Sequence, residues 1–265
     1  MTFTQIIVLA IIQGLTEFLP ISSSGHLVLV PSLFGWADQG LVFDVTVHFG
    51  SLIAVCTYFR SDVAAMIRGA IAVLTGKLEQ PESRLALALG VGTIPAGLAG
   101  LMFAGWIAAN LRSPFVVIAT LAGYAILMAL ADRYGARERQ MSGITLKDVA
   151  VIGVAQALAL IPGTSRSGAT ITAGLALGFR REDAARFSFL LSIPIILLAT
   201  MYEGWKLFSE PTALAAADLA LAAAVSAIVA YISIEFFMRF VNAIGLLPFV
   251  LYRLVLAAGI YYVLV

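Results

Sequence analysis

Two polar breaks interrupt apolar segments, one near the beginning of the chain and one just past its middle. The first break lies in QGLTEFLPISSSGH, residues 13–26, and combines a glutamate, three consecutive serines and a histidine. Gln13 and Glu17 are four residues apart, so both side chains lie on one face of a short helix that leads into the break. An ionisable side chain at membrane depth costs about 2.5–3.5 kcal/mol on insertion scales, so Glu17 and His26 need a specific reason to be there.

The second break, PGTSRSGAT at residues 162–170, repeats the serine–glycine pattern and adds an arginine. A half-helix that starts in such a break offers free backbone N–H groups, hydroxyl caps and the positive end of its dipole, which together bind anions. Arg166 adds a guanidinium suited to bidentate contact with a phosphate. If the two tips meet near the middle of the membrane, the pattern predicts an anion site that also holds acid–base groups.

The two breaks supply nearly all of the candidate site residues. The catalytic candidates are Glu17, Ser23, His26 and Arg166. The candidates for binding the substrate are Gln13, Ser22, Ser24, Gly25, Ser165, Ser167, Gly168, Thr170 and Arg253. From the residues alone, hydrolysis and transport of a phosphorylated substrate are equally compatible with this set.

Each candidate also has a structural explanation. Serines in membrane helices often bond only the local backbone, Glu17 can be a buried ion-pair partner of Arg166, and His26 can be a capping residue. Arg253 lies inside the last apolar segment, where a phosphate contact and a tie between helices are equally good interpretations. His48 lies within an apolar segment with no motif nearby, so we predict an interior histidine with satisfied hydrogen bonds.

The composition requires a membrane to position these residues. Of 265 residues, 61% are hydrophobic and 12% are charged, whereas a soluble domain carries about 25% charge. We therefore expect an all-α polytopic membrane protein, with membrane lipids as its surroundings. The net charge of +1 offers no case for nucleic acid, and the single Cys56 excludes an internal disulfide.

Apolar length separates spanning helices from shorter ones. A span needs about 17–25 residues, and six stretches qualify: 43–59, 85–109, 115–131, 187–202, 219–238 and 246–265. Residues 3–34 and 148–178 contain half-helices on either side of a break, so we predict re-entrant hairpins there.

The two halves of the chain are related by a shift of 143 residues. The shift superposes Gln13 on Gln156, Ser22 on Ser165, Ser24 on Ser167 and Gly25 on Gly168. We predict one membrane domain, 1–265, with a first repeat at 1–132, a cytoplasmic linker at 133–146 and a second repeat at 147–265. Each repeat would be one hairpin followed by three spans, and an odd number of spans inverts the second copy.

The basic residues predict the orientation. In this topology only Arg112 and Lys206 fall on one face, and Arg166 and Arg253 fall inside the membrane. The opposite face holds Arg60, Arg68, Lys77, Arg84, Arg133, Arg137, Arg139, Lys147, Arg180, Arg181, Arg186 and Arg239. Positive charge favours the cytoplasm, so we expect both termini on the outer face.

These segments resemble a known family. QGLTEFLPISSSGH, PGTSRSGAT, RFSFLLSIP at 186–194 and LPFVLYRLVLAAG at 247–259 are similar to segments of the undecaprenyl-diphosphate phosphatase family, the bacitracin-resistance type. The resemblance implies a bacterial inner-membrane enzyme with six spans and two re-entrant hairpins. Such an enzyme removes the terminal phosphate of undecaprenyl diphosphate, at a site open to the outer face, and so recycles the lipid carrier for envelope synthesis.

The resemblance also implies a divalent cation, Mg²⁺ or Ca²⁺, at the first motif and no organic cofactor. In that motif the family has Glu or Gln, three residues, then Glu. Here the pair is Gln13 and Glu17, so Glu17 is the one carboxylate left as a metal ligand, which argues against a tight two-carboxylate site.

We expect in-line phosphoryl transfer with Ser23 as nucleophile and either His26 or Glu17 as its base. Two variants stay open, in which His26 itself or a water molecule attacks the phosphorus. The competing class is an inverted-repeat transporter or flippase for a phosphorylated polyprenyl lipid, since its anion site would look the same. The expected partners are the polyprenyl diphosphate and membrane lipids, with a homodimer as a further expectation.

Overall fold

The computed structural model describes residues 1–111, 113–207 and 214–264, with only the backbone described at 108, 205–207, 263 and 264. Over these residues the chain forms α-helices and one short 3-10 helix, and it contains no strand, as the all-α prediction requires. The helices are α1 Phe3–Thr16, α2 Ser23–Phe34, α3 Gly40–Tyr58, α4 Arg60–Leu74, α5 Pro81–Asn110, α6 Pro114–Tyr134, α7 Leu146–Leu158, α8 Arg166–Ala176, α9 Arg181–Leu207, α10 Ala216–Ile244 and α11 Leu247–Leu264.

Five of the described helices, α3, α5, α6, α9 and α10, are long and apolar enough to cross a membrane. Each of them contains or nearly contains one predicted span, and α9 extends well beyond the marginal stretch 187–202. The sixth predicted span, 246–265, corresponds to α11, whose apolar described part, Leu247–Tyr262, is shorter than the other five. The chain is therefore a multi-pass membrane protein.

The two predicted hairpins are pairs of short helices joined at the polar breaks. Helices α1 and α2 have 14 and 12 residues, and α7 and α8 have 13 and 11. At 1.5 Å per residue, none of these helices reaches across a hydrocarbon layer of about 30 Å. The helix–break–helix pattern is confirmed, and entry of the hairpins from opposite membrane faces stays a prediction.

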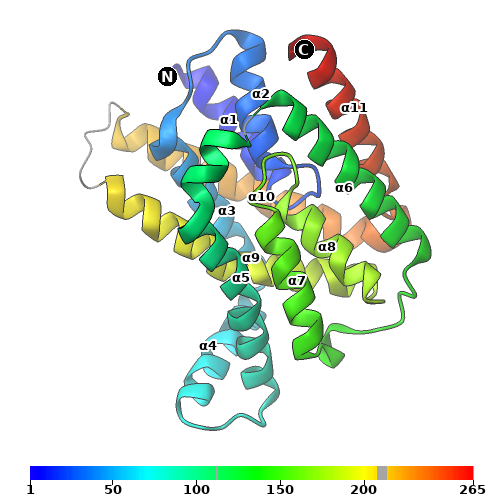
Figure 1. Ribbon diagram of the computed structural model, residues 1–265. Helices are drawn as coiled ribbons and strands as arrows, with labels where there is room; N and C mark the ends of the chain where they lie inside the picture. The colour runs from blue at the N-terminus through cyan, green and yellow to red at the C-terminus, as the bar shows by residue number, and fades with distance from the viewer. Residues whose placement is uncertain (112, 208–213, 265) are drawn as a thin grey trace.

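The hairpins pack into the opposite half of the molecule. Helix α1 lies against α10 and α7 lies against α5, while α3 contacts α9 and α6 contacts α11. Small residues allow α10 to approach both α1 and α3 closely: a Cβ atom on Gly14 would lie 2.7 Å from the Ser226 carbonyl oxygen, and one on Gly50 would collide with that of Ala223. The hairpin tips are thereby held in the interior (Figure 1).

One helix is missing from the sequence prediction. Helix α4, between the first two spans, packs along the beginning of α5 and projects from the body at the end away from both termini (Figure 1). Asp62 of α4 forms an ion pair with Arg186 of α9 at 2.7 Å. Its amphipathic pattern and modest length hide it from a search for apolar spans, so the connection between residues 59 and 85 is helical where no element was expected.

The two termini lie at the same end of the molecule (Figure 1), as the predicted topology requires. Which membrane face this end occupies stays a prediction. Of the two basic residues assigned to that face, Arg112 and the side chain of Lys206 lie outside the described residues.

Candidate active site

The two breaks have the same unusual backbone geometry. Ser22 and Ser165 have φ angles of 77° and 69°, a region that residues other than glycine rarely adopt. Each serine caps a helix: Ser22 Oγ accepts a hydrogen bond from Gly25 N at 3.4 Å, and Ser165 Oγ accepts one from Gly168 N at 3.2 Å. Strain of this kind persists where the surroundings enforce it and is concentrated at functional sites. Both breaks therefore present a helix N-terminus in the same way.

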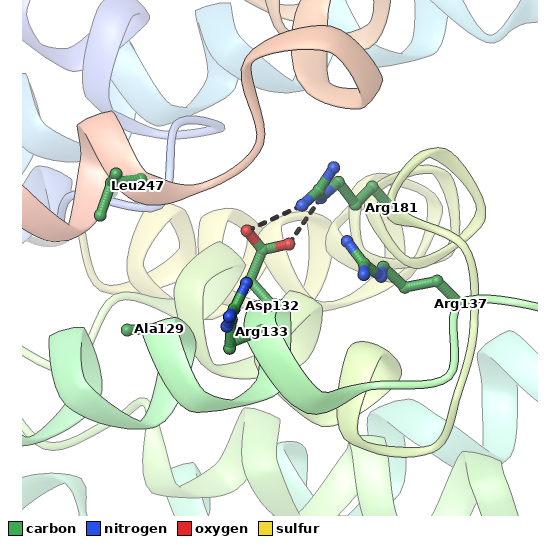
Figure 2. Close-up of a pocket in the computed structure, with 6 residues that line it drawn as sticks. All are labelled: Ala129, Asp132, Arg133, Arg137, Arg181 and Leu247. Atoms are coloured by element: carbon green, nitrogen blue, oxygen red, sulfur yellow. Dashed lines mark hydrogen bonds and ion pairs between the residues drawn. The ribbon is translucent and has the colours of Figure 1, made fainter.

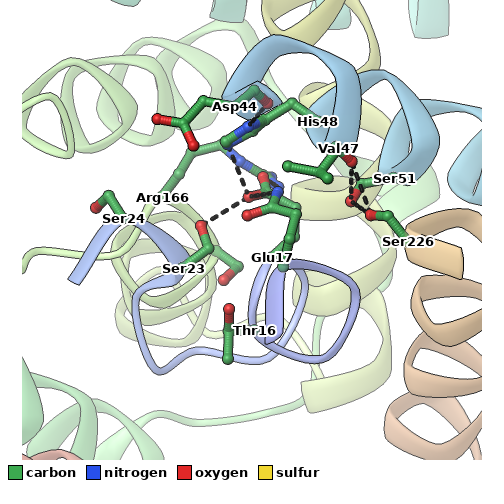
Figure 3. A network of polar contacts seen from close by, with 12 residues as sticks. Thr16, Glu17, Ser23, Ser24, Asp44, Val47, His48, Ser51, Arg166 and Ser226 are labelled. Atoms are coloured by element: carbon green, nitrogen blue, oxygen red, sulfur yellow. Dashed lines mark hydrogen bonds and ion pairs between the residues drawn. The ribbon is translucent and has the colours of Figure 1, made fainter. Parts of the chain in front are cut away.

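Glu17 is the centre of the polar network that joins the two breaks (Figure 3). Its side chain is 7% exposed, and its Oε1 accepts a hydrogen bond from Arg166 Nη2 at 3.2 Å. Its Oε2 accepts hydrogen bonds from Ser23 Oγ at 2.8 Å and from Gln13 Nε2 at 3.1 Å. The structure thus brings together Glu17, Ser23 and Arg166, from two segments almost 150 residues apart.

Arg166 is fixed from a second side by α9. Its Nη1 donates to the Ser188 carbonyl oxygen at 3.0 Å, and its guanidinium lies 5.9 Å from the ring centre of Phe18. Ser188 Oγ in turn contacts Thr170 Oγ1 at 2.6 Å. A planar guanidinium held in this way is preorganised for an anion that would bind beside Ser23. Ser188 lies in RFSFLLSIP, which the sequence analysis used only for the family resemblance.

His26 is turned away from Ser23. Its Nδ1 lies 2.7 Å from the Ser22 carbonyl oxygen, which can only accept, so Nδ1 carries a proton. Its Nε2 lies 2.6 Å from the Tyr252 hydroxyl of α11, and the two rings stack. Within the described residues no hydrogen bond joins His26 to Ser23, so of the two expected bases the geometry favours Glu17. Tyr252 was not among the predicted site residues, because nothing in the spacing of α11 indicates a partner in α2.

His48 of α3 is a second residue that the sequence analysis misjudged. Its Nε2 lies 3.6 Å from Glu17 Oε2, and its Nδ1 lies 2.7 Å from the Asp44 carbonyl oxygen. The carbonyl fixes the proton on Nδ1 and so directs Nε2 at the carboxylate (Figure 3). The expectation of a purely interior histidine is wrong in this respect, since the ring is partly exposed and faces the site.

The position of His48 is fixed by contacts between α3 and α10. Ser226 Oγ donates to the Val47 carbonyl oxygen at 2.7 Å and contacts Ser51 Oγ at 3.2 Å (Figure 3). All three residues are buried. This packing holds the turn of α3 that carries His48 against the hairpin.

The remaining serines of the breaks differ in exposure. Ser167, Thr170 and Ser165 are buried, and Ser167 Oγ donates to the Leu19 carbonyl oxygen at 3.1 Å. Ser167 and Thr170 therefore act in this structure as ties, between the hairpins and within α8. Ser24 is exposed and its neighbour Ser23 is half-buried, so these two are the more accessible hydroxyls of the breaks.

Arg253 of α11 donates only to backbone carbonyl oxygens in the described residues. Its guanidinium is fully buried and reaches Pro20 of the first break and Gly163 and Thr164 of the second, at 3.2, 3.0 and 3.0 Å. It also reaches the carbonyl of Leu121 in α6 at 3.2 Å. Of the two interpretations of Arg253, these contacts support the tie between helices, and they offer no support for the phosphate contact.

The side chains at Glu17 do not fit a dedicated metal site. The described residues contain no group of three or more His, Cys, Asp or Glu side chains placed to share a metal ion. Both Glu17 oxygens already accept hydrogen bonds, one of them from a guanidinium. Gln13 Oε1, buried and without a partner among these residues, is one further oxygen, so the side chains alone do not build a metal cage.

The fold and the site together define a class: a multi-pass membrane protein with a buried carboxylate, hydroxyl and guanidinium arranged around two helix N-termini. Residues 6–259 match the family described as Bacitracin resistance protein BacA. The chain belongs to this family.

Relatives cover almost the whole chain. A protein of Hahella chejuensis named undecaprenyl-diphosphatase is 52% identical over 260 residues, which cover 98% of this chain and 97% of the relative. Proteins with the same name from Nitrosococcus oceani and Thioalkalivibrio sulfidiphilus are 51% and 53% identical, over 99% and 97% of both chains.

Proposed function

We infer that this chain is an integral membrane undecaprenyl-diphosphatase, which hydrolyses undecaprenyl diphosphate to undecaprenyl phosphate and inorganic phosphate. The observation that carries the inference is the 2.8 Å contact between Ser23 Oγ and Glu17 Oε2, with Arg166 on the other carboxylate oxygen. A hydroxyl, its base and a cation are the groups that phosphoryl transfer needs. Membership of the family supplies the substrate, and the product would re-enter cell-wall synthesis as the lipid carrier.

In the first step Ser23 Oγ attacks the terminal phosphorus of the diphosphate, and its proton passes to Glu17 Oε2. The bond between that phosphorus and the bridging oxygen breaks, and the electron pair leaves with the polyprenyl monophosphate. This leaving group is a stable anion, so no acid has to protonate it. Arg166 neutralises charge on the terminal phosphoryl oxygens during the transfer.

In the second step water attacks the phosphoserine. The bond between phosphorus and Ser23 Oγ breaks, Glu17 returns its proton to the serine, and inorganic phosphate keeps the proton that water loses. His48 stays against Glu17 Oε2 in both steps and favours one orientation of the carboxylate. For His26 to attack the phosphorus, its Nε2 must first leave the Tyr252 hydroxyl. The mechanism with His26 as nucleophile therefore needs one more step than the mechanism with Ser23.

A cation is proposed only as a companion of the substrate. Mg²⁺ is commonly held by one or two carboxylates, water and substrate phosphates, and Glu17 is the carboxylate available here. The expected Mg²⁺ or Ca²⁺ would therefore enter the site bound to the diphosphate.

The inverted repeat is also part of the proposal. Helix α1 packs on α10, and α7 packs on α5. These two contacts are equivalent under the repeat, because α10 and α5 are each the second span of their half. The matching φ angles of Ser22 and Ser165 agree with this relation. The same symmetry suits a flippase for phosphorylated polyprenyl lipids, which is the second candidate function, with alternating access to the two faces. We place the protein in the bacterial inner membrane, with the termini and the opening of the site on the outer face and a homodimer as the expected assembly.

The experiment is release of inorganic phosphate from undecaprenyl diphosphate by the purified protein in detergent, followed by acid quenching to trap phosphoenzyme. We expect turnover by the wild type and a loss of about 10³-fold or more in Ser23→Ala, with Ser24→Ala as the neighbouring hydroxyl control. If the wild type releases no phosphate, the flippase is the remaining candidate function. Full activity in Ser23→Ala excludes the serine and returns the choice to water or His26, which His26→Ala then tests.

A further inference from the structure

A basic pocket lies outside the active site, where α6, α9 and α11 meet. It has a volume of about 250 Å³ and is lined by Ala129, Asp132, Arg133, Arg137, Arg181 and Leu247 (Figure 2). The three arginines belong to the set that predicts the cytoplasmic face. Neither the hydrolytic steps nor the two breaks use any of these residues.

Hydrogen bonds hold Arg181 and Asp132 of this pocket in place. Arg181, the first residue of α9, donates two hydrogen bonds to Asp132 of α6, and Asp132 also accepts one from Leu246 N at 3.2 Å. Arg181 further reaches the Asn242 carbonyl oxygen at the end of α10 at 3.3 Å. Asp132 is thereby committed to one arginine and to the backbone before α11.

The other two arginines have no such partner. In the described residues no ion pair or hydrogen bond is formed by the guanidinium of Arg133 or of Arg137. Two neighbouring acids are engaged elsewhere: Glu182 accepts from Asn242 Nδ2, and Asp183 accepts from Met141 N. Three arginines against one aspartate leave the lining with a surplus of two positive charges.

The backbone directs Arg137 into this pocket. Its φ angle is 57°, one of three positive values among described residues other than glycine, and the other two belong to the breaks of the active site. Figure 2 shows its side chain extending from the linker toward the pair of Arg181 and Asp132. An unpaired arginine held at a positive φ beside a second unpaired arginine places two cationic groups where one anion can contact both.

An apolar strip continues from the pocket along α11. Leu247 lines the pocket, and Leu251 and Leu254 follow at helical spacing, with exposures of 59%, 54% and 37%. A free phosphate would use only the arginines. A ligand with a phosphate head and an apolar chain would use both the arginines and this strip.

We propose that this pocket binds the phosphate of an anionic phospholipid, with its acyl chain along α11. Basic pockets between helices at the cytoplasmic interface suit such headgroups. The site is separate from the one that hydrolyses diphosphate, so its occupant is a resident lipid of the membrane. The lipid would link α6, α9 and α11. Arg253 of α11 donates to the Leu121 carbonyl oxygen of α6, and the Ser188 carbonyl oxygen of α9 accepts from Arg166.

The test is the rise in unfolding temperature of the purified protein in detergent as dihexanoyl phosphatidylglycerol is added. We expect saturable stabilisation, with little from phosphatidylcholine of the same chain length and little from glycerol 3-phosphate. Arg137→Gln should weaken the apparent affinity about fivefold, and Arg133→Gln by a similar factor. Arg68→Gln on α4, which removes the same charge from an exposed unpaired arginine elsewhere, should leave it unchanged.

Three outcomes overturn the proposal. Equal stabilisation by phosphatidylcholine shows that the charge is irrelevant. Equal stabilisation by glycerol 3-phosphate shows a site for free phosphate. An affinity of Arg137→Gln equal to that of Arg68→Gln shows that lipid binds elsewhere, and both variants remain testable because neither removes a contact within the fold.

Discussion

Glu17 accepts hydrogen bonds on both carboxylate oxygens, and the donors Gln13, Ser23 and Arg166 come from α1 and the two breaks. Arg166 has two roles in this proposal. It holds Glu17, and its remaining N–H groups are offered to an anion. A single substitution of Arg166 affects both roles. A buried ion pair that only stabilised the fold would not require a hydroxyl at 2.8 Å from the same carboxylate. The chemistry at the residue scale rests on this combination.

Replacement of Arg166 by lysine tests its planar geometry. Arg166→Ala should lower kcat about 10³-fold or more, and Arg166→Lys should recover little, because an ammonium cannot contact two oxygens in the same fixed plane. Arg186→Lys, an exposed arginine paired with Asp62, is the matched control and should keep wild-type kcat. Near-normal phosphate release by Arg166→Lys would contradict a bidentate role.

His48 is expected to position Glu17 and to touch no reacting atom. His48→Ala should lower kcat about 10- to 100-fold with a smaller change in KM, because the ring that lies 3.6 Å from Glu17 Oε2 no longer holds the carboxylate in place. His48→Gln keeps a polar side chain near the carboxylate and should retain more activity than the alanine variant. The neighbouring substitution Phe49→Ala, on the outward face of α3, should have no such effect; equal losses in both alanine variants would indicate general damage to α3.

At the scale of elements, the start of α7 is held by a cluster outside the membrane spans. Arg139 forms a bidentate ion pair with Asp148 at 2.6 and 2.9 Å and also reaches the Leu177 carbonyl oxygen after α8. Thr145 and Asp148 form a capping box at the first turn of α7. The linker, α7 and the end of α8 are thereby joined, which fixes the base of the second hairpin.

This cluster predicts a loss of stability in acid. The hydrogen bonds from Arg139 lower the pKa of Asp148 to about 2 from its usual 3.8. Because the folded-state pKa is the lower one, the stabilisation is complete above about pH 4 and disappears as the pH falls toward 2. Solvent reduces this contribution to stability, because Arg139 is partly exposed and the pair is screened.

The measurement compares thermal unfolding of wild type and Asp148→Asn between pH 6 and pH 2.5. We expect the asparagine variant to be less stable at pH 6 and the difference to shrink as the pH falls below 4. Comparison of the two proteins cancels the titration of the other carboxylates. A difference that does not change with pH would show that Asp148 contributes through its capping shape alone.

At the scale of the whole molecule, the termini lie at one end and α4 projects at the other (Figure 1). Basic residues of α4 and of the following connection belong to the face predicted to be cytoplasmic. The two hairpins reach the centre between these ends, and Arg253 ties both of their tips to α6 and α11. An asymmetry remains, because α4 lies between the first two spans of the first half, whereas only residues 208–215 separate α9 from α10.

The orientation predicts the labelling of introduced cysteines. In a Cys56→Ala background, Thr2→Cys should react with a membrane-impermeant maleimide in intact cells that lack the outer-membrane barrier. Gln80→Cys, in the connection between α4 and α5, should react only after the inner membrane is permeabilised, because positive charge holds that connection in the cytoplasm. Both positions are exposed, so access within the protein is equal. The reverse pattern would invert the topology.

Much of this protein is determined by local features of its sequence. Apolar length gives the spans, and the Pro, Gly and Ser clusters give the breaks, because hydropathy and helix termination are local properties. The types of Glu17, Ser23 and Arg166 indicate an anion site for the same reason, since an ionisable residue in an apolar segment is visible without a structure.

Tertiary structure alone decided which of these residues meet. It placed His48 against Glu17, paired His26 with Tyr252 and gave all the described hydrogen bonds of Arg253 to backbone carbonyls. Each of these contacts joins separate helices, and the spacing within one helix carries no information about the neighbour that it will face. The role of a polar side chain in the membrane depends on that neighbour, because the hydrocarbon around the helices cannot form hydrogen bonds with it.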